Sequence, residues 1–291
     1  MEQLFANILF SACAIFLVAI SFSVIFSTAR FFHFAHAAVI TFAAYASLMS
    51  ASFLNLPTVI SVLLALVAAA GLGWCLNALV YRPMRRKGAS PLVLLLASLG
   101  AYILLQNVIA MVFGDDTKLI GGTAITPGFS LLGAKLTGIQ LVVIFSAIVV
   151  LLAKVYLIDK TRLGLSLRAV ADNPELARVS GIDFETAMGI AFCLGSLLAG
   201  AAGVFRALDV GMTPTMGLPM LLLGVVAVVL GGNGKALGVA IASFLLAFFQ
   251  QVAGWKLGTH WEEAAAFLLL FAFLLFKPEG ILGKPLKKAT V

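Results

Sequence analysis

The sequence predicts an all-α polytopic membrane protein with about 8 to 9 transmembrane helices, some of them short or broken. Two properties of the chain predict this class. Of the 291 residues, 62% are hydrophobic and only 11% are charged, whereas about a quarter of the residues in a soluble domain are charged. Apolar runs of about 18 residues or more recur along nearly the whole chain, and each can cross the hydrocarbon core as a helix. The runs are continuous, whereas the strands of a transmembrane barrel alternate in polarity.

Each apolar run is assigned to the membrane. The first run lacks the basic start of a signal peptide and is too long for one, so we expect it to be retained. Cys13, Cys75 and Cys193 lie inside apolar runs without metal-ligand spacing, and we interpret them as core thiols. We expect one transmembrane domain over residues 1–291, with a cytoplasmic loop at 159–185. The expected spans are roughly 4–28, 36–54, 57–80, 91–113, 139–157, 186–208, 219–231, 236–251 and 260–276.

The basic residues predict which loops are cytoplasmic. A net charge of +7 could suggest nucleic acid, but in a membrane protein Lys and Arg first mark the cytoplasmic side. Of the 19 basic residues, four lie in 82–87, five in 154–178 and four from 277 onward, which makes 13 in three segments. We expect these segments, and hence the C-terminus, to be cytoplasmic, and no nucleic-acid partner. The loops at 114–138 and 209–219 are expected outside.

The stretch VVLGGNGKALG, residues 228–238, resembles a nucleotide-binding loop only superficially. A Walker A loop needs Gly at its first position and Ser or Thr after its Lys, but this chain has Val229 and Ala236 there. We interpret the glycines as a break between two short helices of about 13 to 16 residues, because only a turn here leaves the Lys-rich tail inside. Such broken spans occur where transporters place substrate paths. A plain tight loop between two tilted helices is the alternative.

The stretch TRLGLSLRAVADNPELARVSGID, residues 161–183, predicts one short helix in the basic cytoplasmic loop. Asp172 or Asn173 can cap it, Pro174 suits its first position, Glu175 complements the helix dipole, and Gly181 supplies a left-handed stop. A helix of about seven residues is not stable alone. It must therefore dock, and a partner protein is the natural candidate; a connector on the membrane surface is the alternative.

This stretch resembles the coupling segment of LivH/LivM-type permeases, the branched-chain amino acid family of ABC importers. Three further stretches are similar to that family in the same order: YRPMR after the third span, VVLGGNGKALG, and FKPEGILGKP near the end. The resemblance covers residues 30–285 approximately. It implies an inner-membrane permease subunit of bacterial cells that moves a small polar solute inward by alternating access, with no catalytic residues and no cofactor of its own.

The resemblance also implies partners and docking residues. The partners are a second permease, usually a different homologue, two cytoplasmic ATPases and a soluble solute-binding protein outside, besides the membrane lipids. The short helix at 174–180 is implied to insert into a groove of the ATPase. The implied docking residues of this loop are Arg162, Arg168, Asp172, Asn173, Pro174, Glu175, Arg178 and Gly181.

Between the first two spans the chain departs from the family. Members commonly read Asn-Phe-Ala-His-Gly-Glu where this chain reads HFAHAA, residues 33–38, so the cargo of this chain can differ from branched-chain amino acids. Two histidines three apart would share a helix face, but without a third ligand we expect no metal there. Polar groups in apolar runs are costly and mark either a pathway or interhelical hydrogen bonds. The candidate pathway residues are His33, His36, Ser98, Tyr102, Gln106, Asn107, Gly231, Gly232 and Asn233.

Three alternatives concern the function itself. An intramembrane enzyme would need an acid or a nucleophile with its base deep in a span, and none of the expected spans has Asp or Glu in its central half. An ion-coupled secondary transporter would need a buried acid and an internal repeat. A permease of the same family for urea, short amides or another small solute is the third alternative. Charged residues at the outer span ends, namely Arg206, Asp209, Lys256, Glu262 and Glu263, suit either a binding protein or ordinary interfacial placement.

Overall fold

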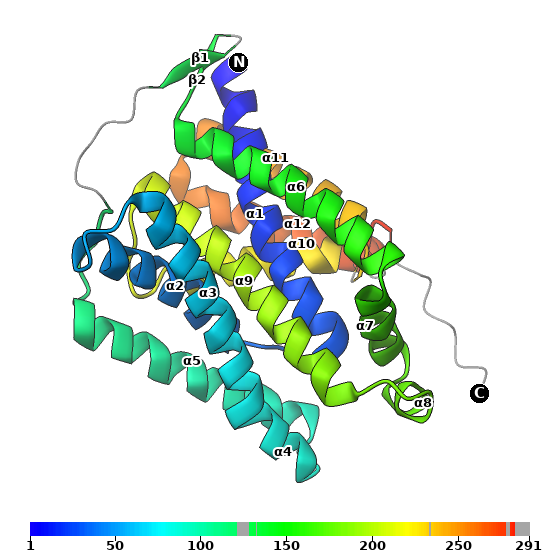
Figure 1. Cartoon of the computed structure of the whole chain (residues 1–291). Helices are drawn as coiled ribbons and strands as arrows, with labels where there is room; N and C mark the ends of the chain where they lie inside the picture. Colours follow the sequence, from blue (N-terminus) through cyan, green and yellow to red (C-terminus); the bar gives the residue numbers. More distant parts are fainter. Residues whose placement is uncertain (121–127, 132, 233, 278–279, 283–291) are drawn as a thin grey trace.

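The chain folds into a bundle of membrane-length helices with a two-stranded hairpin at one end (Figure 1). The computed structural model describes residues 1–120, 128–131, 133–232, 234–277 and 280–282. The elements are α1 (Glu2–Ala29), α2 (Ala35–Ser52), α3 (Thr58–Cys75), a π-helical turn (Leu76–Tyr81), α4 (Arg82–Arg86), α5 (Pro91–Phe113), β1 (Phe129–Leu131), β2 (Ala134–Leu136), α6 (Gly138–Lys160), α7 (Arg162–Asp172), α8 (Pro174–Val179), α9 (Phe184–Val210), α10 (Gly217–Gly231), α11 (Ala236–Leu257), a 3₁₀ turn (Thr259–Trp261) and α12 (Glu262–Phe276).

The number of spans agrees with the sequence. In the described part of the chain, eight helices are long and apolar enough to cross a membrane, and α10 is a ninth, shorter apolar helix. An all-α polytopic membrane protein with 8 to 9 spans, one of them short, is therefore confirmed.

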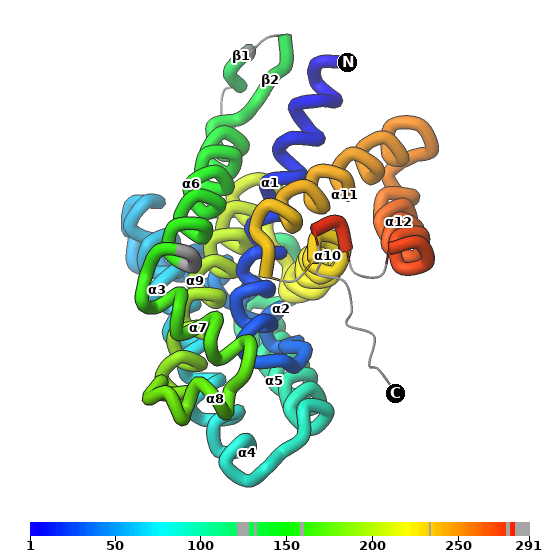
Figure 2. The backbone as a smooth tube through the Cα atoms, turned by 90° about the vertical axis from the view of Figure 1, so that its right-hand side faces the viewer, coloured from blue at the N-terminus to red at the C-terminus, as the bar shows by residue number. Residues whose placement is uncertain are grey.

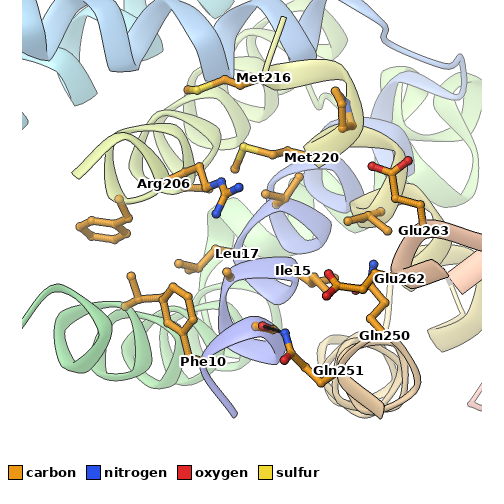
Figure 3. Close-up of a pocket in the computed structure, with 18 of the residues that line it drawn as sticks. Phe10, Ile15, Leu17, Arg206, Met216, Met220, Gln250, Gln251, Glu262 and Glu263 are labelled. Atoms are coloured by element: carbon orange, nitrogen blue, oxygen red, sulfur yellow. Dashed lines mark hydrogen bonds between the residues drawn. The ribbon is translucent and has the colours of Figure 1, made fainter. Parts of the chain in front are cut away.

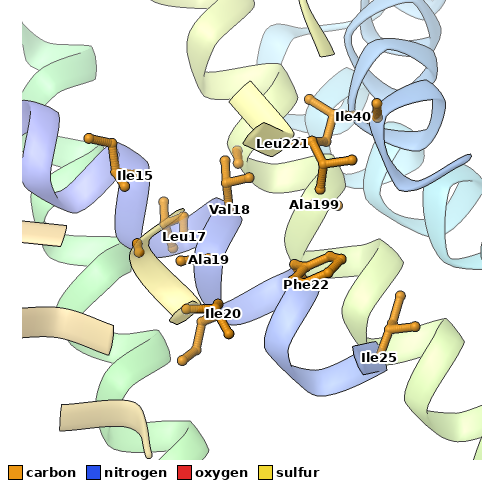
Figure 4. Packing of buried hydrophobic residues seen from close by; sticks show 14 of the residues in the cluster. Ile15, Leu17, Val18, Ala19, Ile20, Phe22, Ile25, Ile40, Ala199 and Leu221 are labelled. Carbon is orange, nitrogen blue, oxygen red and sulfur yellow. The ribbon is translucent and has the colours of Figure 1, made fainter. Parts of the chain in front are cut away.

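Helix α1 is the central element of the bundle. It packs against α9, α10, α11 and α6, and its side chains from Ile15 to Ile25 form the middle of the apolar core (Figure 4). Ile40 of α2, Ala199 of α9 and Leu221 of α10 meet this core from three sides. The outer helices α3, α5, α6 and α12 leave much of their apolar surface uncovered, as expected of helices that contact lipid.

Small residues bring α9 close to its neighbours. A Cβ atom at Gly195 would lie 2.5 Å from Cγ1 of Ile25, and one at Gly203 would overlap the carbonyl oxygen of Ile40. Backbones that approach this closely gain van der Waals contact, which drives helix association in a membrane without help from water. The glycines of α9 are therefore packing residues.

The two ends of the bundle differ in their loops and short elements. At one end, the side chain of Gln3 bonds the backbone of Lys135 in the β1–β2 hairpin, which pairs antiparallel from Phe129 opposite Leu136. At the same end, Lys118 and Met212 exchange two backbone hydrogen bonds of 2.9 Å. We call this the outer end, because the loops at 114–138 and 209–219 lie there. The opposite, inner end carries α4, α7 and α8 (Figures 1 and 2).

Three elements differ from the sequence prediction. Helix α11 has 22 residues and continues to Leu257, so the expectation that it is short was wrong and only α10 is short. The third span continues to Arg86 through the π-helical turn; Pro83 has no N–H for the carbonyl of Leu79, so the regular hydrogen-bond ladder fails there. The loop after α6 holds a second helix, α7, that was not expected.

Candidate functional site

Helix α8 at the inner end is fixed at both of its ends. The Asn173 side-chain oxygen accepts from the backbone N–H groups of Glu175 and Leu176, each at 3.1 Å. Pro174 occupies the first helical position. Gly181 has φ of +82°, which side chains with a Cβ rarely adopt. The predicted short helix is therefore confirmed, with Asn173 rather than Asp172 as its cap.

Helix α7 anchors α8 to the bundle. Thr161 caps α7 by accepting from the N–H of Gly164 at 3.2 Å. Leu167 and Val170 of α7 are buried together with Ala177 of α8, against Val24 of α1 and residues of α9. Arg30, at the end of α1, donates to the backbone carbonyls of Ala171 and Asp172 at the end of α7. The loop that holds α7 and α8 is thus fixed to α1 and α9.

The opposite face of this loop is open. Seven of the eight predicted docking residues are exposed, and Pro174 is half-buried. The sequence interpretation missed two apolar residues on the same helix, Leu176 and Val179, which are 63% and 86% exposed. Their spacing of three places them on one helix face, and this spacing could have indicated them. The exposed residues of the loop include the seven predicted ones and this apolar pair: Arg162, Arg168, Asp172, Asn173, Glu175, Arg178, Gly181, Leu176 and Val179.

A chain of side chains joins α8 to the third span. Arg178 of α8 lies 4.5 Å from the ring centre of Phe184, and Arg85 lies 5.8 Å from the same ring. Arg85 donates through Nη2 to Glu185 and to Asn77, both at 2.9 Å. Asn77 belongs to the π-helical turn. A displacement of α8 therefore has a direct route to the point where the hydrogen-bond ladder of the third span is irregular.

The start of α9 is stabilised by Asp183. Its carboxylate accepts from the backbone N–H of Glu185 at 3.0 Å and from the hydroxyl of Thr186. These hydrogen bonds, with that from Thr186 the larger, lower the pKa of the Asp183 carboxyl below its ordinary value because they favour the ionised form. Asp183 thus remains a charged cap at neutral pH, next to the Arg82 and Arg85 side chains that pair with Glu185 at 3.7 and 2.9 Å.

The two predicted pathway histidines are buried in the inner half of the bundle. His36 lies in the first turn of α2, but His33 lies in the non-helical segment before it, so the expectation that they share a helix face was wrong. Nδ1 of His33 lies 3.1 Å from the Tyr81 hydroxyl, and Nε2 of His36 lies 2.9 Å from that of Ser21. Both residues are 0% exposed. Their remaining ring nitrogens have no hydrogen-bond partner among the described residues.

The predicted pathway residues of α5 differ in burial: some are packed inside the bundle and others are exposed. Ser98 is buried, accepts from the N–H of Phe34 and lies within bonding distance of the Phe32 carbonyl, both at 3.1 Å. Tyr102 is buried, and Gln106 is half-buried. Asn107 is exposed and donates to the carbonyl of Ile103 in its own helix. Ser98 thus joins α5 to the segment before α2, which is the interhelical role left open above.

The glycine break is a site of close backbone contact. A Cβ atom at Gly231 would lie 2.5 Å from the carbonyl carbon of Gly238. After α12 the chain returns to this break, and the N–H of Ile281 donates to the carbonyl of Leu230 at 2.7 Å. Gly231 and Gly232 are buried. Asn233, predicted with them, lies outside the described residues.

The large cavity of the structure lies at the outer end, away from these positions. It has a volume of about 750 Å³ and lies between α1, α9, α10, α11 and the start of α12 (Figure 3). None of the predicted pathway residues that the structure describes lines it. Its polar walls include three of the charged residues noted at the outer span ends, Arg206, Glu262 and Glu263. The cavity could not be predicted from the sequence, because its walls come from helices far apart along the chain.

Metal binding finds no support in the described part of the chain. No group of three or more His, Cys, Asp or Glu residues is gathered there closely enough to hold a metal ion.

The comparisons with known proteins agree with this architecture. The chain is 27% identical over 284 residues to the high-affinity branched-chain amino acid transport system permease protein BraD of Pseudomonas aeruginosa, which covers 92% of this chain and 91% of BraD. It is also 27% identical over 282 residues to the permease protein LivH of Escherichia coli, with the same coverage. The fold is similar to PsaBC from Streptococcus pneumoniae in complex with Fab, with a TM-score of 0.53, 13% identity, and coverage of 95% of this chain and 92% of that one.

The family itself is shown by a match over nearly the whole length. Residues 4–276 match the family model described as the permease component of the branched-chain amino acid transport system. The resemblance noted in the sequence is confirmed. The chain therefore belongs to the branched-chain amino acid transport system permease family, whose members are membrane components of ABC importers and not enzymes.

Proposed function

We propose that this ABC importer permease carries a branched-chain or closely related amino acid inward by alternating access. The family membership supports the importer role, and the docking loop at the inner end carries the proposal further. A short helix with capped ends and an exposed apolar pair, Leu176 and Val179, suits insertion into a groove of a partner. ATP hydrolysis then belongs to the partner ATPases.

The inner-end contacts suggest how ATPase movement reaches the membrane. Closure of the ATPase dimer shifts the groove that holds α8. Arg178 and Phe184 transmit this shift to Arg85 and Glu185, and Asn77 passes it to the π-helical turn. The ATPases drive the change only by binding the two permease states with different affinity.

The proposal includes the partners and the topology. We expect a second permease, which is a different homologue, two ATPases and a solute-binding protein at the outer end. The chain lies in the inner membrane with multiple spans and a cytoplasmic C-terminus. The contact of Ile281 with the glycine break supports this side, because it holds the start of the tail at the turn whose Lys235 is expected inside.

The rival functions differ in their requirements. A secondary transporter that works alone gains nothing from an exposed docking helix. A permease for urea or short amides retains the helix but does not need a site for two opposite charges. The co-purification experiment below tests the secondary transporter. The identity of the transported solute tests the permease for urea or short amides.

The test is co-purification of the full-length tagged chain with its ATPases in gentle detergent. The variant combining Leu176→Asp and Val179→Asp places two carboxylates on the apolar face of α8 and should lose the ATPases while the second permease stays bound. Leu119→Asp, at a residue 51% exposed near the outer end, is the matched control and should retain both. ATPases that remain bound to the double variant would contradict docking through α8.

A further inference from the structure

The cavity at the outer end has walls of three kinds. Apolar side chains, hydroxyl and amide groups, and charged side chains of both signs line it (Figure 3). The apolar lining includes Ile15, Leu17 and Val18 of α1, Met216 directly before α10, and Met220 and Leu223 of α10. A volume of about 750 Å³ lies in the range of small-molecule sites, about 300 to 1,000 Å³, and is large enough for a small amino acid with several waters.

The charged groups come from different helices. Arg206 lies in the last turns of α9, and Glu262 and Glu263 begin α12. Figure 3 shows Arg206 on one side of the cavity and both glutamates on the other. Within the described part of the chain, none of the three is in a salt bridge. Charges of opposite sign that face a cavity without pairing with each other are available for a ligand that carries both signs.

A buried amide adds a second observation. Gln250 of α11 is only 7% exposed and lines the cavity between the glutamates and α1. Its side chain has no hydrogen bond to any residue that the structure describes, whereas the neighbouring Gln251 donates to the Ser11 hydroxyl at 3.0 Å. An amide that lines a cavity and makes no hydrogen bond to the protein is available to a molecule in that cavity. A bound ligand or water in the cavity would satisfy it.

We propose that this cavity is an amino-acid site at the outer mouth of the permease, in which Arg206 binds the α-carboxylate, Glu262 binds the α-ammonium group and the apolar wall accepts an aliphatic side chain. Gln250 bonds the same two charged groups from the buried wall. Glu263 is more exposed than Glu262 and attracts the ammonium group at the mouth. The site rests on the proposed function, because it gives the cargo its chemical class: a zwitterion with an apolar side chain.

The charges of the lining explain why recognition needs Arg206, the acceptors Glu262 and Gln250, and the apolar wall together. A guanidinium binds a carboxylate through two parallel hydrogen bonds, so Arg206 selects the acid end of the solute. Glu262 and Gln250 offer acceptors to the ammonium group. Urea and short amides carry neither charge. An aliphatic acid can pair only with Arg206, and an aliphatic amine only with Glu262. The site therefore distinguishes an amino acid from each of its halves.

The test measures binding of three probes to the assembled importer without its binding protein. Leucine carries both charges, 4-methylpentanoate lacks the ammonium group and 3-methylbutylamine lacks the carboxylate. We expect leucine to bind at least about tenfold more tightly than either half. Arg206→Gln should reduce the preference for leucine over 3-methylbutylamine to about twofold or less. Glu262→Gln should do the same for leucine over 4-methylpentanoate.

The controls separate this inference from a folding defect and from the proposed function. Lys256→Gln changes a charge at the same end, on a residue that does not line the cavity, and should preserve both preferences. Each variant should still co-purify with the ATPases, which tests the importer role separately. Unchanged preferences in both cavity variants, or no leucine binding by an importer that retains its ATPases, would overturn the site alone.

A lipid headgroup with an ammonium and a phosphate has related charges, so the lipid must be varied. Binding is measured in nanodiscs of phosphatidylcholine alone and with phosphatidylethanolamine added. An equal affinity for leucine in both supports the soluble zwitterion. Loss of leucine binding with phosphatidylethanolamine would instead identify the cavity as a lipid site and overturn the inference.

Discussion

Arg85 is the residue on which the contacts of the inner end converge. Its side chain is only 12% exposed, and it reaches Glu185 of α9, Asn77 of the π-helical turn and the ring of Phe184. Arg82 approaches the same carboxylate at 3.7 Å, but it is 43% exposed. A buried charge that loses its partner costs far more than an exposed one, because water cannot replace the partner.

We predict that Arg85→Met destabilises the permease by about 2 to 3 kcal/mol, because it leaves Glu185 half-buried without its closest partner. Arg82→Met, the matched control, should cost less than about 1 kcal/mol. The measurement is thermal unfolding of the purified complex, together with solute uptake in proteoliposomes. Equal losses of stability in both variants would show that Arg85 has no special role at this junction.

At the scale of elements, α8 is stable only because its ends are fixed. Six residues cannot form an isolated helix, so the cap at Asn173 and the left-handed Gly181 decide whether α8 exists before a partner binds. The buried Ala177 provides its only fully buried contact with the bundle in the described chain.

We predict that Asn173→Ala weakens ATPase binding by about fivefold, since loss of the cap costs about 1 kcal/mol and frays the helix before docking. Asn173→Asp keeps an oxygen acceptor in the same position and should restore binding to within about threefold. The measurement is the affinity of the purified ATPase for the permease in nanodiscs. If both Asn173→Ala and Asn173→Asp bind the ATPase weakly, the Asn173 amide contacts the ATPase directly and loss of the cap is not the cause.

The break between α10 and α11 depends on contact between two backbones. We predict that Gly231→Ala lowers the melting temperature strongly, because its Cβ would lie 2.5 Å from backbone atoms of Gly238 and Val239, which cannot move as a side chain can. Gly100→Ala in α5 is the control: a Cβ there meets nothing within 4 Å, so the change should be neutral or stabilising. Thermal unfolding followed by size-exclusion chromatography measures both.

For the whole molecule, the membrane-spanning helices could be predicted from the sequence, whereas the contacts between these helices could not. Continuous apolar runs predicted the number of helices, because a membrane requires length and apolar character. The non-helical segment around His33 was missed, because it is buried by two residues far along the chain, Tyr81 of the π-helical turn and Phe192 of α9. Helix α11 was ended too early at its paired glutamines, which lie inside the helix and line the outer cavity. Local periodicity carries no information about a cavity lined by six helices.

The topology is also a property of the whole molecule, because the side on which the C-terminal tail lies depends on how many times the chain crosses the membrane. With a turn between α10 and α11 we expect the tail on the inner side, whereas a single continuous helix would place it outside. A maleimide reacts with hydrated thiols only, so reactivity from either side reports the crossing count. Cys13, Cys75 and Cys193 are first replaced by Ala to give a background without cysteine.

In this background we predict that Leu119→Cys reacts in intact cells, whereas Val179→Cys and Lys277→Cys react only after permeabilisation. The first two positions lie at opposite ends of the bundle and are exposed, and Lys277 directly follows α12. Leu152→Cys in α6 is exposed in the isolated chain, but it should face lipid and remain unreactive from both sides. Reaction of Lys277→Cys in intact cells would mean that the number of crossings after α8 is odd, as with one continuous helix in place of α10 and α11. The proposal of a cytoplasmic tail would then be wrong, whereas the docking helix would be unaffected.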